Sequence, residues 1–191
     1  MEAVIMLKRP KMNEYHPFFE RYVTLVPDEK LFDTLKEQQE TTINLLRNIS
    51  SEQAEYQYEE KKWNLKEVLG HMADAERVLS YYLFVVARGD TLSFPPFDKD
   101  LYTTNADFNR LDFQDILSDF SIVRQCTSSL IACLSNNAWI RTGTILNHPT
   151  TARALAYIIA GHERHHQAII KERYLLKYNI DLDSNEKRKS F

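Results

Sequence analysis

The segment GHERHH, residues 161–166, has the spacing in this chain that most directly suggests chemistry. His162, Glu163 and His166 match His-Glu-x-x-His, a helical pattern in which two histidines bind zinc and the glutamate acts as a general base in metalloproteases. The same residues are compatible with a different metal site, with a catalytic histidine or with a solvated polar helix. These alternatives differ in the direction that they require of each side chain.

The direction of these side chains follows from helical geometry. An α-helix turns by about 100° per residue, and the isoleucines of this segment lie within roughly 60° of Leu155. His162 and His166 fall at about −20° and about +20° from the same origin, at the centre of the apolar face, whereas His165 and Glu163 fall roughly 80° away at its two edges. Two inward imidazoles are costly to bury without a ligand, so a divalent metal is an economical interpretation beside that of satisfied core histidines, and a third histidine elsewhere would decide between them.

The protease interpretation is the weaker one. Glu163 is expected on the flank of its helix, away from a metal, so Glu163→Gln should have little effect on any activity. Proteases of this kind also need strands that bind the substrate, and the sequence offers no convincing strand.

A third ligand must come from another segment. His71, in VLGHMADAE, lies near the edge of its helix's apolar sector, which permits an inward direction without requiring it. His16 and His148 lie in segments that the periodicity does not orient. On the helix of His71, Glu76 could orient a ligating imidazole from behind it or pair with an arginine. Asp74 and Arg77 are expected to be solvated. Trp63 and Trp139 are expected to be aromatic residues of the core or of a lid.

Four long helices are expected to carry these residues. The helical periodicity runs from about 30 to 49, 65 to 87, 113 to 134 and 151 to 178, with Asp28, Asn64 and Asp112 as N-caps. Asn64 and Glu67 have capping-box spacing, and Gly89 is a natural stop. We therefore expect a single all-α domain over residues 1–191, a four-helix bundle with a long crossover loop between its second and third helices, at about 89–111. Residues 1–27 should pack on the bundle, and residues 179–191 form a tail.

Composition narrows the function. The chain has 191 residues, 43% hydrophobic, with only 4 glycines and 6 prolines, which favours helices over sheet. A net charge of −3 gives no basic field for nucleic acid, and no apolar run reaches the roughly 20 residues of a membrane span, so a cytoplasmic protein is expected. Cys126 and Cys133 would lie about 10 Å apart on one helix, too far for a disulfide, and are expected to be small core residues.

Four separated motifs resemble the DinB superfamily, in its YfiT-like branch. The stretch KKWNLKEVLGHMADAERV is similar to its pattern Trp-x-x-x-Glu-Val-x-Gly-His-x-x-Asp-x-Glu, and ALAYIIAGHERHHQAIIKERYL resembles its last helix. RGDTLSFPPFDKDLY resembles the loop between its second and third helices, and NEYHPFFERYVTLVP its N-terminal segment. The resemblance covers about residues 8–177.

The resemblance implies a four-helix bundle with one metal held by His71, His162 and His166. Zinc, nickel, iron or copper would suit three neutral imidazoles, and an open position would remain for water or substrate. The better-understood members of the family are thiol S-transferases that use bacillithiol or mycothiol, so a small thiol and an electrophile are the expected partners. A metal-dependent hydrolase and a non-catalytic metal-binding protein of the stress response stay open as alternatives. A homodimer is left open as well.

Overall fold

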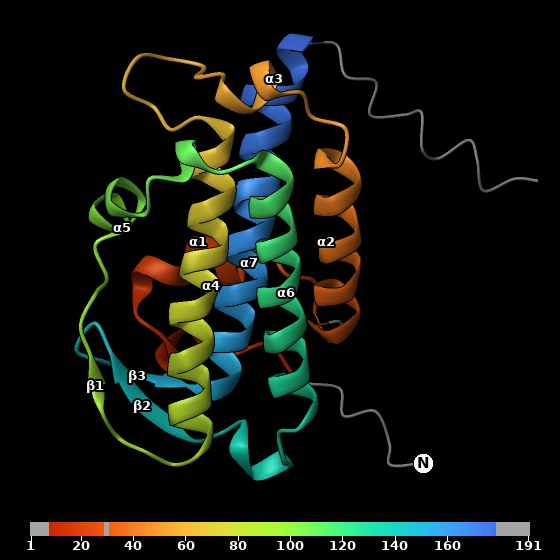
Figure 1. The fold of residues 1–191 in the computed structure, drawn as a ribbon. Coiled ribbons are helices and arrows are strands. Elements are labelled where there is room, and N and C mark those ends of the chain that lie inside the picture. Colours follow the sequence, from red (N-terminus) through yellow and green to blue (C-terminus); the bar gives the residue numbers. More distant parts are fainter. Residues whose placement is uncertain (1–7, 29–30, 179–191) are drawn as a thin grey trace, which may run out of the picture.

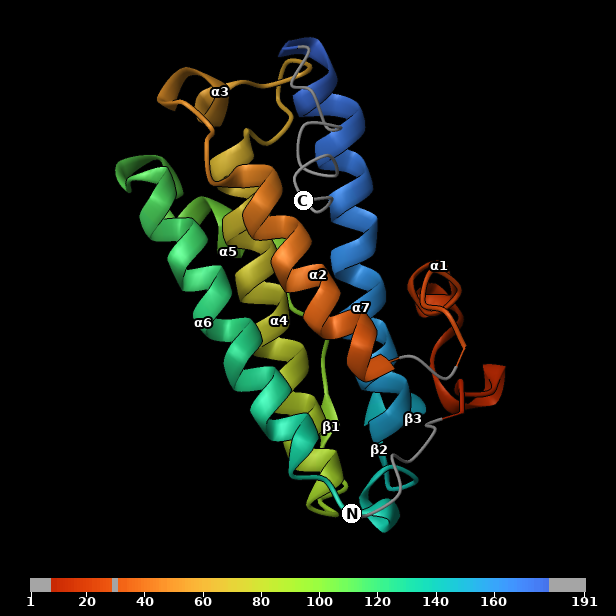
Figure 2. The same ribbon diagram turned by 90° about the vertical axis from the view of Figure 1, so that its right-hand side faces the viewer.

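The computed structural model describes residues 8–28 and 31–178, in which four long helices stand side by side (Figures 1 and 2). These helices are α2 (Leu31–Leu46), α4 (Leu65–Ala87), α6 (Phe113–Ala132) and α7 (Ala152–Ile169). The predicted four-helix bundle is confirmed. α4 has the predicted bounds, whereas α2 ends at Leu46 rather than Ile49, and α6 ends at Ala132 rather than Leu134. The start predicted at Lys30 lies outside the described residues.

Local caps explain where the helices begin and end. The side chain of Asn64 accepts a hydrogen bond from the backbone N–H of Glu67, and Glu67 accepts one from that of Asn64, so the predicted capping box is present. Gly89 follows α4 with φ 88°, a conformation that glycine adopts at little cost. Asp112 occupies the N-cap of α6 but makes no capping hydrogen bond with its side chain. The side chain of Thr151 caps α7 by accepting from the N–H of Ala154.

The helices do not follow a simple up-and-down order. α2 and α7 run in one direction, and α4 and α6 run in the other (Figure 1). α4 packs against α6 and α7, and α2 packs against the same two helices, so α2 and α4 stand diagonally. Because α4 and α6 are parallel, the connection between them, residues 88–112, must return along the length of the bundle, as expected of a crossover loop.

A small sheet closes one end of the bundle, contrary to the expectation that the chain has no strand. β1 (Ser93–Phe94) pairs in parallel with β2 (Thr142–Ile145), which pairs antiparallel with β3 (His148–Thr151). Leu146 and Asn147, between β2 and β3, both have positive φ (52° and 59°) and form a two-residue hairpin turn. The strands have only two to four residues, too short for alternating hydrophobicity to reveal.

Shorter helical elements complete the described chain. α3 (Ser51–Glu55) and α5 (Lys99–Ala106) are α-helical, and α7 continues into a π-helical stretch, Ile170–Leu175. The 3₁₀ turns are Met12–Glu14, Pro17–Phe19, Phe108–Arg110, Asn136–Ala138 and Leu176–Tyr178. Within the described part of the N-terminal segment, α1 (Glu20–Val23) packs against α7 (Figure 2). Within the described residues, no helix combines the length and the apolarity that crossing a bilayer requires.

The core is divided into two hydrophobic clusters by a polar layer. One cluster contains Leu79 and Leu83 of α4 and residues 154–160 of α7, and the other contains Val68, Leu69, Met72 and Ala73 of α4 together with Ile170. Between the clusters, each of the four bundle helices contributes buried polar side chains: Gln38 and Thr42 on α2, Glu76 on α4, Arg124 and Thr127 on α6, and Glu163 and Gln167 on α7.

Candidate metal centre

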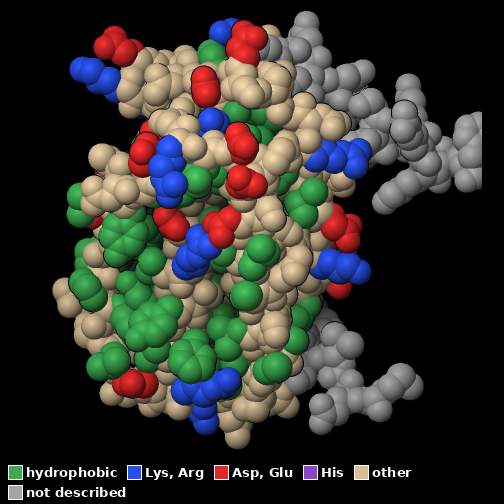
Figure 3. All heavy atoms as spheres, viewed as in Figure 1, with side chains coloured by type: hydrophobic (Ala, Val, Ile, Leu, Met, Phe, Trp, Pro, Cys, Tyr) green, Lys and Arg blue, Asp and Glu red, His purple; other side chains and the backbone are tan. Residues whose placement is uncertain are grey.

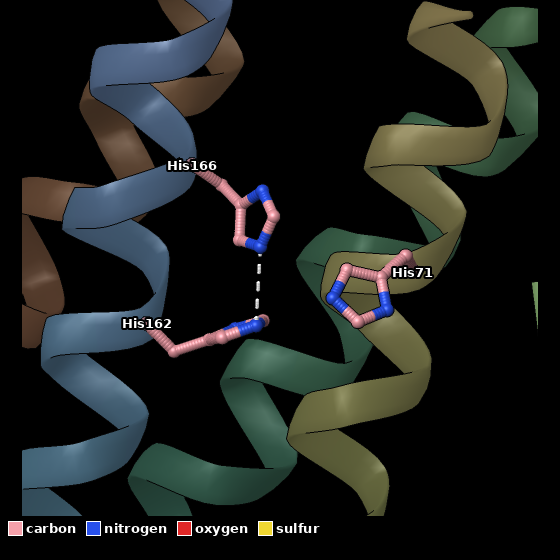
Figure 4. Close-up of side chains that lie close together, drawn as sticks. All are labelled: His71, His162 and His166. Carbon is pink, nitrogen blue, oxygen red and sulfur yellow. Dashed lines mark hydrogen bonds between the residues drawn. The ribbon is translucent and has the colours of Figure 1, made fainter. Parts of the chain in front are cut away.

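Three histidines from two facing helices converge inside the bundle. His71 on α4 and His162 and His166 on α7 point toward one another (Figure 4). Their side chains are buried, and each offers a nitrogen within 4.8 Å of those of the other two. Both predicted directions on α7 are confirmed, and the structure shows that His71 also points inward.

The spacing of the ring nitrogens fits a metal ion. The Nε2 atoms of His162 and His166 lie 3.2 Å apart. Two nitrogens that bind one zinc ion at about 2.0–2.1 Å in tetrahedral geometry would lie about 3.3 Å apart. Among the described residues, Nδ1 of His166 has no hydrogen-bond partner. The centroid of the His71 ring lies 5.2 Å from that of His162 and 5.0 Å from that of His166.

The surroundings keep these imidazoles uncharged. Burial lowers the pKa of His71 to about 4, and the charge of Lys99 acts in the same direction. Burial holds the pKa values of His162 and His166 well below the ordinary range, and the neighbouring histidines add to the effect. Neutral imidazole is the form that donates a lone pair to a metal, so the donor set fits a divalent ion without first having to lose protons.

A cavity of about 330 Å³ opens beside the histidines. His71 and His162 form part of its wall, and Lys99 is the cation among its lining residues, which include no carboxylate. The remaining lining is aromatic or aliphatic: Phe18, Phe19, Tyr22, Ala75, Leu79, Tyr82, Pro95, Pro96, Phe97, Ile145, Leu146 and Ile158. Apolar side chains also gather on the outer surface over β1 and its connection to α5 (Figure 3). The cavity therefore suits an apolar group placed next to the histidines.

The N-terminal segment forms one wall of this cavity. The ring of Tyr22 lies edge-on to the rings of His162 and His165, with centroids 5.3 and 5.5 Å away. This approach depends on Gly161, because a Cβ atom at that position would lie 2.0 Å from the backbone oxygen of Tyr22. Burial raises the pKa of the Tyr22 phenol, so this side chain stays protonated near neutral pH.

The other histidines lie outside the group of three. His165 is half-buried at the edge of α7, as its angular position predicts. His16 accepts a hydrogen bond from the N–H of Phe18 through Nδ1, and its ring lies 5.9 Å from that of His148. Both residues are at the end of the molecule that carries the sheet.

Glu76 and Glu163, the two glutamates near the histidines, both contact Arg124, a residue that no sequence pattern identified as part of a site. Arg124 on α6 is fully buried, and its Nη2 lies 2.7 Å from Oε2 of Glu76 and 2.5 Å from Oε2 of Glu163. Of the two roles left open for Glu76, the structure therefore shows the pairing with an arginine. Burial raises the pKa of Glu76; the Arg124 charge opposes this shift, and Glu163 reinforces it.

Glu163 is more deeply buried than a flanking position suggested. Its Oε1 accepts a hydrogen bond of 2.6 Å from the Thr42 hydroxyl and one of 3.3 Å from the Gln167 amide. It faces α2 and α6, whereas His71 stands on α4. The direction away from the histidines is as predicted, but the side chain lies in the polar layer rather than at a surface.

The remaining expectations have mixed outcomes. Cys126 and Cys133 are free but exposed, so the prediction of core positions was wrong: Cys126 faces outward from α6, and Cys133 is the residue that follows its end. Trp139 is buried in the core, and the Trp63 ring lies 4.9 Å from that of His71. Arg77, expected to be solvated, is exposed but forms ion pairs with Asp74 and Asp119.

These features define a class of protein: an all-α bundle whose core brings together three histidines able to hold a metal ion. The chain belongs to the DinB superfamily, whose family model matches residues 34–170. Among solved structures it is similar to YfiT from Bacillus subtilis, described as a probable metal-dependent hydrolase with an unusual four-helix bundle topology. The identity is 16%, the similarity covers 89% of this chain and 94% of that one, and the TM-score is 0.72, so the likeness concerns the fold. No curated protein sequence matches the chain.

Proposed function

We propose that the protein binds one divalent metal ion through His71, His162 and His166 and uses it to transfer a small thiol to an apolar electrophile. The observation that carries the proposal is the convergence of three buried, uncharged imidazoles beside an apolar cavity. A divalent ion held there would lower the pKa of a thiol or a water molecule that reaches it.

The residues around the centre support a thiol as the nucleophile. With three neutral ligands and no carboxylate in the cavity lining, the site would keep the positive charge of its ion and favour an anionic sulfur. Lys99 stands at the wall with its ammonium 2.7 Å from Asp100 and over the Trp63 ring, and it would have to exchange the exposed Asp100 carboxylate for an anionic group of a bacillithiol-type thiol. The aromatic wall that includes Phe18, Phe19 and Tyr22 would hold the electrophile and exclude water.

Hydrolysis of a small molecule is the second candidate, because the structurally similar YfiT is described as a probable metal-dependent hydrolase. Water has a pKa of about 15.7 and a thiol one of about 8.5, so water depends more strongly on a base than a thiol does. The cavity lining provides no carboxylate for that role. A non-catalytic metal-binding protein of the stress response is the third candidate.

Metal analysis tests the binding site. Purified protein should contain about one divalent ion per chain, and His162→Ala should lose most of it. His165→Ala is the matched control, because it removes an adjacent imidazole that stands outside the group of three, and it should retain the ion. Full occupancy in a variant that lacks all three histidines would contradict the proposed site.

The reaction is tested with a panel of low-molecular-weight thiols and a haloaromatic or epoxide electrophile. The background should be Cys126→Ser, Cys133→Ser, because both native thiols are exposed and would react with the electrophile themselves. Consumption that requires both metal and thiol, and that fails in His166→Ala, would support transfer. In cobalt-substituted protein, the active thiol should also produce a sulfur-to-cobalt charge-transfer band. Metal-dependent cleavage without any thiol would favour the hydrolase, and neither reaction would favour the non-catalytic protein.

A further inference from the structure

The most unusual buried group in the described bundle is Arg124. Its side chain is fully buried, and one guanidinium nitrogen, Nη2, contacts a carboxylate from each of the two helices that carry the histidines. Glu76 comes from α4, five positions after His71, and Glu163 comes from α7, directly after His162. The arginine itself comes from α6, which carries none of the three histidines.

The ion pairs belong to a network that connects all four helices. Thr42 of α2 donates to Glu163, and Gln167 of α7 donates to the Thr42 hydroxyl at 2.8 Å and to the backbone oxygen of Gln38 at 3.1 Å. The Gln38 amide donates to the backbone oxygen of Ala160 at 2.7 Å. This polar layer lies at the level of the histidines on α7 and separates the two hydrophobic clusters.

Stability alone does not account for such a layer. Buried ion pairs recover their desolvation cost poorly, and apolar side chains of similar volume often stabilise a core as well or better. Apolar contacts are short-ranged but not directional, whereas the attraction between opposite charges fixes which atoms meet. Nη2 of Arg124 lies 2.7 and 2.5 Å from its two carboxylates as an ion pair, although among the described residues it has no hydrogen-bond partner of regular geometry. A guanidinium held between two carboxylates therefore restricts how far apart their helices can stand.

We propose that Arg124 is a positioning residue that holds α4 and α7 at the separation and register in which His71 meets His162 and His166. The consequence for metal binding rests on the metal centre proposed above. A shift of α4 relative to α7 would move one ligand away from the other two, because His71 stands alone on its helix. Loss of such supporting contacts typically weakens metal binding by about 10- to 100-fold.

The decisive variant replaces the charged trio with apolar residues: Glu76→Leu, Arg124→Met, Glu163→Leu. It leaves no unpaired charge, so it should fold with wild-type helicity. The gain from removing buried charges is opposed by the loss of the acceptor of the Thr42 hydroxyl, so its urea midpoint should stay close to that of wild type. We expect its metal affinity, measured by competition with a chelator, to fall by at least about tenfold. The cobalt d–d spectrum should change as well. Arg124→Lys keeps the charge but places it on a shorter reach and a differently shaped group than Nη2, and it should give an intermediate affinity.

Lys66→Met is the matched control. Lys66 is a buried cation on α4, five positions before His71, and its ammonium lies 3.4 Å from Glu55 and takes no part in the Arg124 ion pairs. Its loss should lower stability without changing metal affinity. Wild-type affinity and an unchanged cobalt spectrum in the triple apolar variant would overturn the proposal and leave the trio a purely structural role.

A distance measurement separates this inference from the proposed function. Spin labels at Phe84→Cys on α4 and Ala168→Cys on α7, both exposed and near opposite ends of the bundle, report the register of the two helices without metal. The background is again Cys126→Ser, Cys133→Ser. We expect the distance distribution to shift or broaden in the triple apolar variant and not in Lys66→Met. If wild-type protein binds no metal, the proposed function fails, while an unchanged distribution would still overturn the role of Arg124.

Discussion

Glu163 follows a histidine of the candidate centre, yet its carboxylate interacts with α2 and α6. Glu163→Gln should therefore leave metal content unchanged and have little effect on the rate of any reaction found. It should lower the free energy of unfolding by about 2 kcal/mol, because it weakens the contact with a buried guanidinium. Urea titration and metal analysis measure the two effects separately.

Glu172→Gln provides the control for this change, since Glu172 is an exposed carboxylate on the same helical segment. It should alter stability by no more than about 0.5 kcal/mol. A loss of turnover by orders of magnitude in Glu163→Gln, with metal retained, would instead indicate that this glutamate acts as a general base, as in a metalloprotease.

At the scale of single residues, the sequence predicts the direction of a side chain where the apolar periodicity of its own helix defines that direction. His162 and His166 could be oriented because the isoleucines around them define one face of one helix. Arg124 could not be found in this way. Arginine is usually exposed, and its two partners come from helices that are distant in the sequence, so only the assembled bundle reveals why it is buried.

Among the elements, the contact of α1 with α7 depends on Gly161. Gly161→Ala places a methyl group 2.0 Å from the backbone oxygen of Tyr22, so the N-terminal segment must move outward. We expect faster amide hydrogen exchange in residues 15–23 and a net loss of about 1–2 kcal/mol, since the overlap outweighs the better helix propensity of alanine. Metal content should be unchanged.

Gly143→Ala is the comparison for this effect. Its added methyl group would meet Cγ2 of Val86 at 2.5 Å, the end of a side chain rather than a backbone atom. It should not change hydrogen exchange in residues 15–23. Wild-type exchange rates in Gly161→Ala would show that the segment is not held against α7 in the way described.

A second contact anchors the N-terminal segment and depends on pH. Arg153 donates two hydrogen bonds to Glu14, and Thr151 donates one of 2.9 Å. Burial alone would raise the pKa of Glu14, but the hydrogen bonds from Arg153, the Lys11 N–H and Thr151 hold it below its ordinary value of 4.5. A lowered pKa means that the contact stabilises the fold fully above about pH 4.5 and is lost as pH falls through the folded-state value.

Glu14→Gln should therefore lower the free energy of unfolding at neutral pH by about 1 kcal/mol. Its difference from wild type should shrink below about pH 4.5 and disappear in stronger acid. Urea titrations across this pH range measure the difference, with the exposed Glu37→Gln as control. A difference that grows on acidification would contradict the assignment.

The elements themselves were predicted unevenly, for a physical reason. Long amphipathic helices repeat their pattern over several turns, and α4 is bounded by a capping box and by a glycine, so both its ends could be predicted. The hairpin of β2 and β3 has four residues per strand and turns through Leu146 and Asn147, without the usual glycine. The pairing of these strands depends on their contacts with the end of the bundle. These contacts are made by residues distant in the sequence, so no local sequence pattern predicts them.

For the whole molecule, metal should stabilise the fold without being required for it. The two hydrophobic clusters do not include the three histidines, so chelator-treated protein should keep its helical circular dichroism. Adding metal at about 1,000 times its dissociation constant should raise the free energy of unfolding by about 4 kcal/mol. A variant without His71, His162 and His166 should show no such increase. Unfolding on removal of metal would contradict this expectation.

The position of the N-terminal segment bears on how the protein is prepared for experiment. The family model begins at residue 34, and a recombinant fragment cut to match residues 34–170 would retain all three histidines. It would lack Phe18, Phe19 and Tyr22, which line the cavity next to His162. Such a fragment would carry its ligands beside a cavity open to water, so metal analysis of it would be informative, but a negative result in a substrate screen would not.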